Sequence, residues 1–358
     1  MRPLWLASTP FTGDLSGMDP DLLLAGLRAG NTAALARAIS VVENGRPGFE
    51  RLLAEVHPLL GRARRIGLTG PPGAGKSTLV ERLVTTYRQT GLRVAVVAVD
   101  PTSPFSGGAL LGDRIRMESV ALDQGVYIRS MGTRGSLGGL ATTTREVCDL
   151  LDAAGFDRIL IETVGVGQSE LDVARMADAT VLVLVPESGD GIQTLKSGVM
   201  EIADLFVVNK ADRAGADKLR QEIEVTLGIR RGNAFRGMPA HHGFKGRAER
   251  PAQVDAGWEP IVLLTVAAKG EGTTELVDAL DRRHAWLAAS GTLDARRRQR
   301  LLERTREVVE RATRRWIWDE TRAEERIAER LDEIVAGRVS PYEVATEVLD
   351  GLKQGERI

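Results

Sequence analysis

The chain has 358 residues, which allows one large α/β domain with appendages or two modest domains. Its hydrophobic fraction of 43% is ample for a packed core, and its 48 basic residues nearly balance its 49 acidic residues. This balance gives no reason to expect nucleic acid or a membrane as a partner. Cys148 is the only cysteine, which excludes an internal disulfide framework and a cysteine-rich metal site.

The N-terminal part of the chain (1–60) is predicted to be a leader followed by a helical extension. The stretch 1–17 is too polar for a signal peptide, and no window approaches about 18 continuous apolar residues. We therefore expect a cytoplasmic protein. From Asp19 onward apolar residues recur near the helical period, and Asp19-Pro20 and Asn31-Thr32 are helix-start signals.

Residues 61–290 alternate short β-branched runs with helical patterns. The runs are almost continuously apolar, as expected for strands that are covered on both faces. They are Ile66–Thr69, Val94–Val99, Val126–Arg129, Ile159–Ile161, Val181–Val185, Phe206–Val208 and Ile261–Val266. This alternation predicts an α/β fold with a doubly wound, mostly parallel sheet. The stretch 230–257 is rich in Gly, Arg and Pro and is predicted to be a long surface loop.

Residues 291–358 are predicted to form a helical tail. Its Arg/Glu-rich sequence carries an apolar stripe at helical spacing, formed by Leu301, Val308, Val309, Ala312 and Trp316. A tail with such a stripe cannot bury it alone. We therefore expect the tail to pack on the preceding domain or on a second subunit.

A phosphate-binding loop is predicted directly after the first strand. The pattern G-x-x-x-x-G-K-[ST] is matched by Gly70, Pro71, Pro72, Gly73, Ala74, Gly75, Lys76 and Ser77, and Thr78 follows in the same predicted set. Glycines let successive backbone N–H groups point at the phosphates, and the start of a helix adds partial positive charge. Lys76 is expected to reach the β- and γ-phosphates, and the Ser77 hydroxyl to bind Mg²⁺.

Three acidic residues are candidates for a Mg²⁺ site. Asp100 and Glu162 end two predicted strands, and Asp113 lies in the loop after the first of these. Ligands of an open parallel sheet bind beyond the carboxyl ends of its strands, so Asp100 and Glu162 should face the phosphates. Because Mg²⁺ keeps several waters, not all three need to bind it directly. Capping of a helix is the structural alternative, most of all for Asp113.

The sequence Asn209-Lys210-Ala211-Asp212 is predicted to bind guanine. Asp212 would accept hydrogen bonds from guanine N1 and N2, and the Lys210 stem would cover the ring. Adenine lacks these donors and would leave the carboxylate unpaired, at a cost of about 1–3 kcal/mol or more. The loop Ala267-Ala268-Lys269 follows the last predicted strand and suits backbone contact with guanine O6, although it lacks the serine often found there.

Three longer motifs resemble the MeaB/ArgK-type GTPases, to which the human methylmalonic aciduria type A protein belongs. They are the stretches 99–117 and 161–170 and the stretch from Gly189 through 200–212. The resemblance covers about 60–290 and continues more weakly into the tail. It implies a P-loop GTPase that serves as a chaperone for an adenosylcobalamin-dependent acyl-CoA mutase. Such proteins gate the loading of intact cofactor and protect or reactivate the mutase.

The resemblance also implies roles for single residues. Lys76 and Ser77 would hold phosphate and Mg²⁺, and Asp100, Asp113 and Glu162 would be the acidic Mg²⁺ and switch residues. The loop 187–198 would couple the nucleotide state to the mutase, and the tail would be a homodimerisation arm. The loop 187–198 departs from the pattern of family members tied to methylmalonyl-CoA mutase. Mutases for isobutyryl-, 2-hydroxyisobutyryl- or ethylmalonyl-CoA therefore remain alternatives.

The water-orienting residue of GTP hydrolysis is not evident. Val164-Gly165-Val166-Gly167 stands where some GTPases place a glutamine, so intrinsic hydrolysis should be slow. We expect partner binding to reposition Gln193, Lys196 or Arg116 and so complete a catalytic set with Lys76 and Glu162. For these three repositioned residues, a solvated surface role is the alternative.

Other functions fit the sequence less well. A GTP- or ATP-dependent metallochaperone would need a Cys/His cluster, and a targeting GTPase of the signal-recognition type would need a Met-rich domain. An ATPase linked to amino-acid transport conflicts with Asn-Lys-Ala-Asp. A module that holds GTP without turnover remains open and would differ in phosphate release.

Overall fold

The computed structural model describes residues 20–100, 117, 119–132, 139–163, 169–186, 200, 203–230 and 257–353. The chain separates into two compact units, Met1–Asp294 and Ala295–Ile358, and each is described by itself below. The predicted loop at 230–257 lies almost wholly outside the described residues. No described helix combines the length and apolar character that a bilayer crossing requires.

The first unit is built on a seven-stranded sheet with the order β3-β2-β4-β1-β5-β6-β7. All neighbouring strands are parallel. The strands are β1 Arg64–Thr69, β2 Val94–Asp100, β3 Val126–Gly132, β4 Arg158–Thr163, β5 Ala179–Leu184, β6 Leu205–Asn209 and β7 Ile261–Thr265. The predicted α/β fold with its seven apolar runs is confirmed, although β5 and β7 each end one residue earlier than expected.

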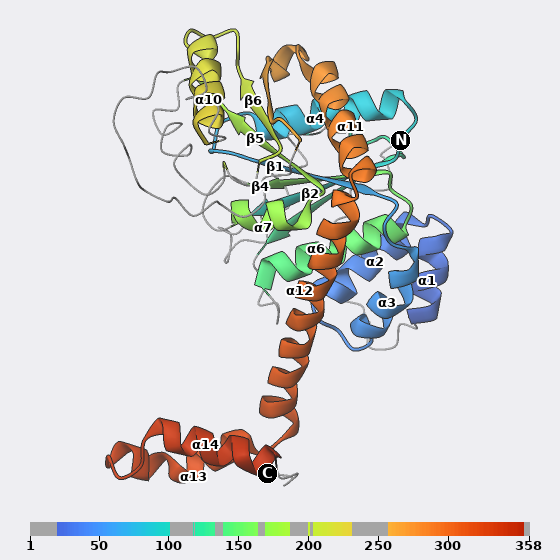
Figure 1. The fold of residues 1–358 in the computed structure, drawn as a ribbon. Helices are drawn as coiled ribbons and strands as arrows, with labels where there is room; N and C mark the ends of the chain where they lie inside the picture. Colours follow the sequence, from blue (N-terminus) through green and yellow to red (C-terminus); the bar gives the residue numbers. More distant parts are fainter. Residues whose placement is uncertain are drawn as a thin grey trace, which may run out of the picture. The chain divides into compact units, whose positions relative to one another are not determined.

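Helices cover both faces of the sheet, as the continuous apolar runs predicted. Side chains alternate along β2, where Val94 and Val96 join one core and Ala95 and Val97 join another. Figure 1 shows α4 and α11 on one side of the sheet and α6 and α7 on the other. The α-helices described between β1 and the second unit are α4 Lys76–Gln89, α6 Gly139–Ala153, α7 Ser169–Met176, α10 Ala216–Arg230 and α11 Thr273–Ala289.

The N-terminal extension packs against α6. It consists of α1 Pro20–Arg28, α2 Thr32–Glu43, α3 Phe49–Val56 and the short 3₁₀ turn η1 His57–Leu59. Asn31 caps α2, as predicted, because its side chain accepts hydrogen bonds from the N–H groups of Ala33 and Ala34 at 2.9 and 3.1 Å. Leu27, Ile39 and Leu52 share one hydrophobic core with α6.

The second unit is helical. It contains most of α12 Thr292–Arg315, followed by a π-helical turn Trp316–Glu320, α13 Ala323–Val335 and α14 Pro341–Lys353. Helices α13 and α14 pack together, with Val344 and Val348 buried. Much of the predicted stripe is exposed in the single chain: Val309 is 58% exposed and Trp318, just beyond the stripe, is 47% exposed. The stripe leaves the α-helical period at Trp316, where the π turn begins.

Candidate nucleotide-binding site

The predicted site residues gather at one edge of the sheet. Strands β1, β4, β6 and β7 run parallel, so their carboxyl ends meet at the same edge. The predicted phosphate loop follows β1, Glu162 lies at the end of β4, and the guanine-binding segments follow β6 and β7. The fold therefore brings together motifs that lie far apart in the sequence.

The phosphate loop needs glycine at two close approaches of its backbone. Gly70 has φ +138°, and a Cβ there would lie 2.0 Å from the carbonyl oxygen of Val183. Gly75 has φ +85°, and a Cβ there would lie 2.4 Å from Nδ2 of Asn209. Any larger residue would push the loop away from the sheet. Helix α4 begins directly after Gly75, so its N-terminal amide groups and their partial positive charge lie next to the loop.

Lys76 is nearly buried, with an exposed fraction of 5%. Its ammonium group donates hydrogen bonds to the carbonyl oxygens of Gly70 and Pro71 at 2.7 and 3.0 Å. These bonds hold the Lys76 ammonium group against the backbone of the phosphate loop, beside the amide groups at the N-terminus of α4. The arrangement places one fixed positive charge where an anionic phosphate chain would be neutralised.

Ser77 and Glu162 place a hydroxyl and a carboxylate oxygen side by side next to the loop. The Ser77 hydroxyl donates to Oε1 of Glu162 at 2.6 Å, and Glu162 is 7% exposed. Hard oxygen donors at one point, beside a phosphate-binding loop, fit Mg²⁺. Asp100 ends β2, whose neighbour is β4, so its backbone lies at the same edge, but its side chain and all of Asp113 lie outside the described residues.

Asn209 joins three segments of the site. This side chain is buried, and its Nδ2 donates to the carbonyl of Ala74 in the phosphate loop at 2.8 Å. Its Oδ1 accepts from the hydroxyl of Thr265 at 3.1 Å and from the N–H of Ala267 at 3.0 Å. The carboxamide therefore holds the turn that begins at Ala267 against the phosphate loop. The sequence predicts that Asn209 binds the nucleotide and that Thr265 begins the guanine loop, but it does not predict the hydrogen bond between these two side chains.

Lys210 and Asp212 are presented in a constrained turn. Lys210 has φ +57°, which is uncommon for a residue other than glycine and recurs at functional sites. Hydrogen bonds from Ala211 N–H to the Thr265 carbonyl and from Arg213 N–H to the Lys210 carbonyl hold the turn, both at 3.0 Å. The Asp212 carboxylate lies 3.4 Å from Nζ of Lys269, and both side chains are partly exposed.

Ala267–Lys269 form a 3₁₀ turn, η2, directly after β7. The turn is closed by hydrogen bonds from Lys269 N–H to the Val266 carbonyl at 2.8 Å and from Gly270 N–H to the Ala267 carbonyl at 3.1 Å. Arg82 of α4 also donates to this turn, a contact that sequence reasoning missed.

Two of the predicted catalytic residues, Gln193 and Lys196, lie outside the described residues, as do Arg116 and the whole of the loop 187–198. Lys76 and Glu162, the other two, lie within the described site. The structure thus brings together the predicted phosphate loop, one acidic residue and both guanine segments.

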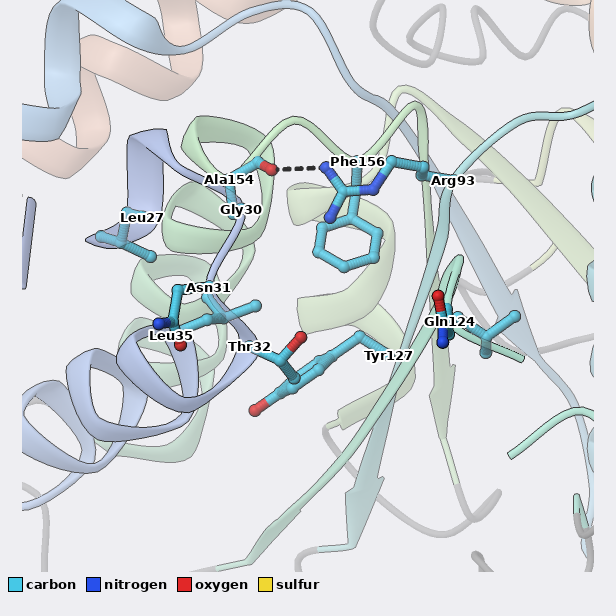
Figure 2. A pocket seen from close by; sticks show the side chains of 11 residues that line it. Leu27, Gly30, Asn31, Thr32, Leu35, Arg93, Gln124, Tyr127, Ala154 and Phe156 are labelled. Carbon is cyan, nitrogen blue, oxygen red and sulfur yellow. Dashed lines mark hydrogen bonds between the residues drawn. The ribbon is translucent and has the colours of Figure 1, made fainter. Parts of the chain in front are cut away.

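A separate small pocket lies near the amino ends of the strands, away from this site. Figure 2 shows Arg93 within it, donating to the carbonyl of Ala154 at 2.8 Å. The guanidinium carbon lies 4.5 Å from the centroid of the Phe156 ring. Asn31 and Thr32 line the same pocket from the N-terminal extension. The charged group is engaged by a carbonyl and an aromatic ring, so we interpret this pocket as packing between the extension and the sheet.

Comparisons with known proteins agree with this geometry. Residues 35–322 match the family model described as methylmalonyl Co-A mutase-associated GTPase MeaB. A protein of Pyrococcus abyssi named as a GTPase is 46% identical over 289 residues, covering 81% of this chain and 83% of the relative. The mitochondrial methylmalonic aciduria type A homolog of Mus musculus is 40% identical, covering 77% of this chain and 66% of the relative.

A solved structure has the same fold over most of the chain. The crystal structure titled as a LAO/AO transport system kinase superposes with a TM-score of 0.63 and 28% sequence identity, covering 93% of this chain and 97% of the other. The family match spans both the phosphate loop and the guanine segments. The chain is therefore a P-loop GTPase of the MeaB family.

Proposed function

We propose that this GTPase is a chaperone of an adenosylcobalamin-dependent acyl-CoA mutase, and that it gates cofactor loading and protects or reactivates the mutase. The observation that carries this proposal is the match of residues 35–322 to a family described as mutase-associated. The mouse relative is named a methylmalonic aciduria type A homolog, and this name supports a link to methylmalonyl chemistry. Methylmalonyl-CoA mutase is the first candidate partner.

The nucleotide is proposed to bind along the edge described above. Gly70–Thr78 would hold the phosphates through backbone amides, with Lys76 neutralising the β- and γ-phosphates. Ser77 and Glu162 would hold Mg²⁺, together with Asp100 and Asp113 directly or through water. Bound Mg²⁺ would supply further charge neutralisation to phosphoryl transfer. Asp212 would accept from guanine N1 and N2, and the turn Ala267–Lys269 would meet guanine O6.

Intrinsic hydrolysis is proposed to be slow and to be stimulated by the partner. Phosphoryl transfer depends on positioning and charge neutralisation, and Lys76 and the phosphate loop provide both. Orientation of the attacking water is assigned to Gln193 or Lys196 in the loop 187–198, once the mutase has bound. Coupling of this loop to the mutase would make turnover depend on the partner.

The remaining parts of the chain are proposed to assemble and place this site. We assign 1–60 to a helical extension, 61–290 to the GTPase domain and 291–358 to an arm that forms a homodimer. Exposure of Val309 and Trp318 in the single chain supports the last assignment. A cytoplasmic location would bring the protein to its partner.

The test measures phosphate release from GTP by the purified chain, alone and with methylmalonyl-CoA mutase. We expect a slow basal rate and stimulation of at least about tenfold by the mutase. Lys76→Ala should lose both rates, while Lys218→Ala, an exposed lysine on α10, should keep them. Related acyl-CoA mutases assayed in parallel would identify the true partner. Absence of stimulation by every mutase would contradict the chaperone function while leaving the GTPase assignment intact.

A further inference from the structure

Arg82 links the phosphate-binding helix to the turn at the predicted base site. It lies on α4, nearly two helical turns after Lys76. Its Nε donates to the carbonyl of Ala267 at 3.0 Å, and its Nη2 donates to the carbonyl of Ala268 at 2.8 Å. One edge of the planar, charged group thus holds two consecutive carbonyls. No other role of the site described above uses Arg82.

Because peptide bonds are planar, these two hydrogen bonds also fix the direction of the N–H groups that follow the two carbonyls. In a trans peptide the C=O and the following N–H point in opposite directions. Because Arg82 holds the carbonyls of Ala267 and Ala268, the N–H groups of Ala268 and Lys269 point away from it. The Lys269 N–H is used by the Val266 carbonyl at 2.8 Å. Of these two groups, the Ala268 N–H is therefore the candidate for contact with a base in the proposed site.

We infer that Arg82 is a positioning residue for guanine recognition, which orients and polarises the Ala268 amide toward the O6 keto oxygen of the base. The inference rests on the proposed base site. A guanidinium bonded to the carbonyl of a peptide withdraws electron density from its N–H, and the N–H becomes a stronger donor. Guanine presents an acceptor at position 6, whereas adenine presents an amino group that would meet this donor unfavourably. Arg82 therefore adds to base selectivity without touching the base.

A positioning role differs from simple support of the fold in one measurable way. Loss of support would weaken the binding of every nucleotide by the same factor. Loss of positioning would most weaken the binding of ligands that carry a strong acceptor at position 6. Sulfur is a far weaker acceptor than oxygen, so 6-thio-GDP is the matched probe for GDP. Changing the arginine and changing the ligand atom together form a double-mutant cycle between Arg82 and position 6.

The experiment measures the dissociation constants of GDP and 6-thio-GDP by calorimetry, with full-length protein and Mg²⁺. Arg82→Met keeps the aliphatic stem and removes every donor. We expect this variant to raise the dissociation constant of GDP by about tenfold and that of 6-thio-GDP by about threefold or less, so that the preference for GDP over 6-thio-GDP decreases. Arg82→Lys, which retains a charge and a single nitrogen, should recover part of the preference.

Arg88→Met is the control on the same helix. Arg88 donates to the Asp123 carboxylate at 2.9 Å and to the Leu92 carbonyl at 2.7 Å, away from the base site. Its removal should leave the ratio of the two dissociation constants at the wild-type value. If Arg82→Met leaves that ratio unchanged, Arg82 has no part in reading position 6 and the inference is overturned. If the wild-type protein binds neither ligand, the proposed base site itself fails.

Discussion

Asn209 shows how a single buried side chain can join the two ends of the proposed nucleotide site. Its carboxamide donates a hydrogen bond to the phosphate loop and accepts hydrogen bonds from Thr265 and Ala267. From the sequence, the Asn-Lys-x-Asp motif is predicted to bind the guanine base. In the structure its first residue ties the phosphate end of the site to the base end, and its last residue, Asp212, is the one offered outward. The two functions require a buried asparagine and a partly exposed aspartate three residues apart.

Asp212→Asn should reverse the base preference. Guanine offers donors at N1 and N2, and the amide nitrogen of asparagine would face one of them. We expect GDP to bind about a hundredfold more weakly, because both a charge-assisted hydrogen bond and its geometry are lost. Xanthosine diphosphate, which has an acceptor in place of the N2 amine, should bind better than GDP.

Calorimetry with the two diphosphates measures this preference. The exposed Asp217, in the first turn of α10, provides the matched control as Asp217→Asn. Retention of full GDP affinity by Asp212→Asn would place guanine recognition elsewhere.

The sequence predicted the site where its chemistry depends on residue type in a fixed local pattern. Lys76, Ser77 and Asp212 follow strands and belong to motifs whose spacing is legible. Arg82 was missed because it binds main-chain carbonyls, which every residue possesses, and because its partner turn is distant in the chain. The hydrogen bond between Ser77 and Glu162 likewise depends on β1 and β4 being neighbours, which no local pattern reports.

At the scale of elements, α11 is fastened to the sheet by a buried ion pair. Arg283 is 1% exposed, and its Nη2 lies 2.5 Å from Oδ1 of Asp204, just before β6. Its guanidinium carbon also lies 4.9 Å from the ring centroids of both Trp258 and Trp286. Asp204 additionally accepts the N–H of Thr180 at 2.8 Å. The strands were predictable from their apolar runs, but this polar cluster in the core was not.

Arg283→Met should destabilise the first unit strongly. The substitution leaves the Asp204 carboxylate buried without its cation, at a cost of about 3–5 kcal/mol. Urea unfolding followed by tryptophan fluorescence measures the loss. Arg220→Met removes an exposed pair with Glu224 on α10 and should cost only about 0.5 kcal/mol. Equal costs for the two variants would show that the buried pair contributes no more than a surface pair.

At the scale of the whole molecule, the apolar stripe of the tail predicts a change in assembly. Charges placed on an apolar face that is buried between subunits oppose association. We therefore expect Val309→Glu with Trp318→Glu to convert the proposed homodimer to a monomer. Light scattering of the full chain measures the mass. Glu310→Gln, an exposed neighbour, should leave the dimer intact, and a dimer that persists in the double variant would refute the assignment of the tail.

Cys148 provides a reporter of global opening. It is fully buried in α6, and burial raises the pKa of its thiol to about 12. At pH 8 the native protein should therefore react with a thiol reagent only when it unfolds, and much more slowly than the unfolded chain. Addition of GDP and Mg²⁺ should slow the reaction further, because ligand binding stabilises the native state. Fast labelling of the native protein would show that α6 opens independently of the sheet.

The sheet order also bears on how the chain is made. Strand β1 lies between β4 and β5, which end at Thr163 and Leu184. Synthesis proceeds from the N-terminus, so β1 leaves the ribosome long before either neighbour exists. Its apolar residues Ile66 and Leu68 must wait for partners that are encoded far downstream. The phosphate loop that follows β1 therefore cannot be held in its final position until Leu184 has been translated.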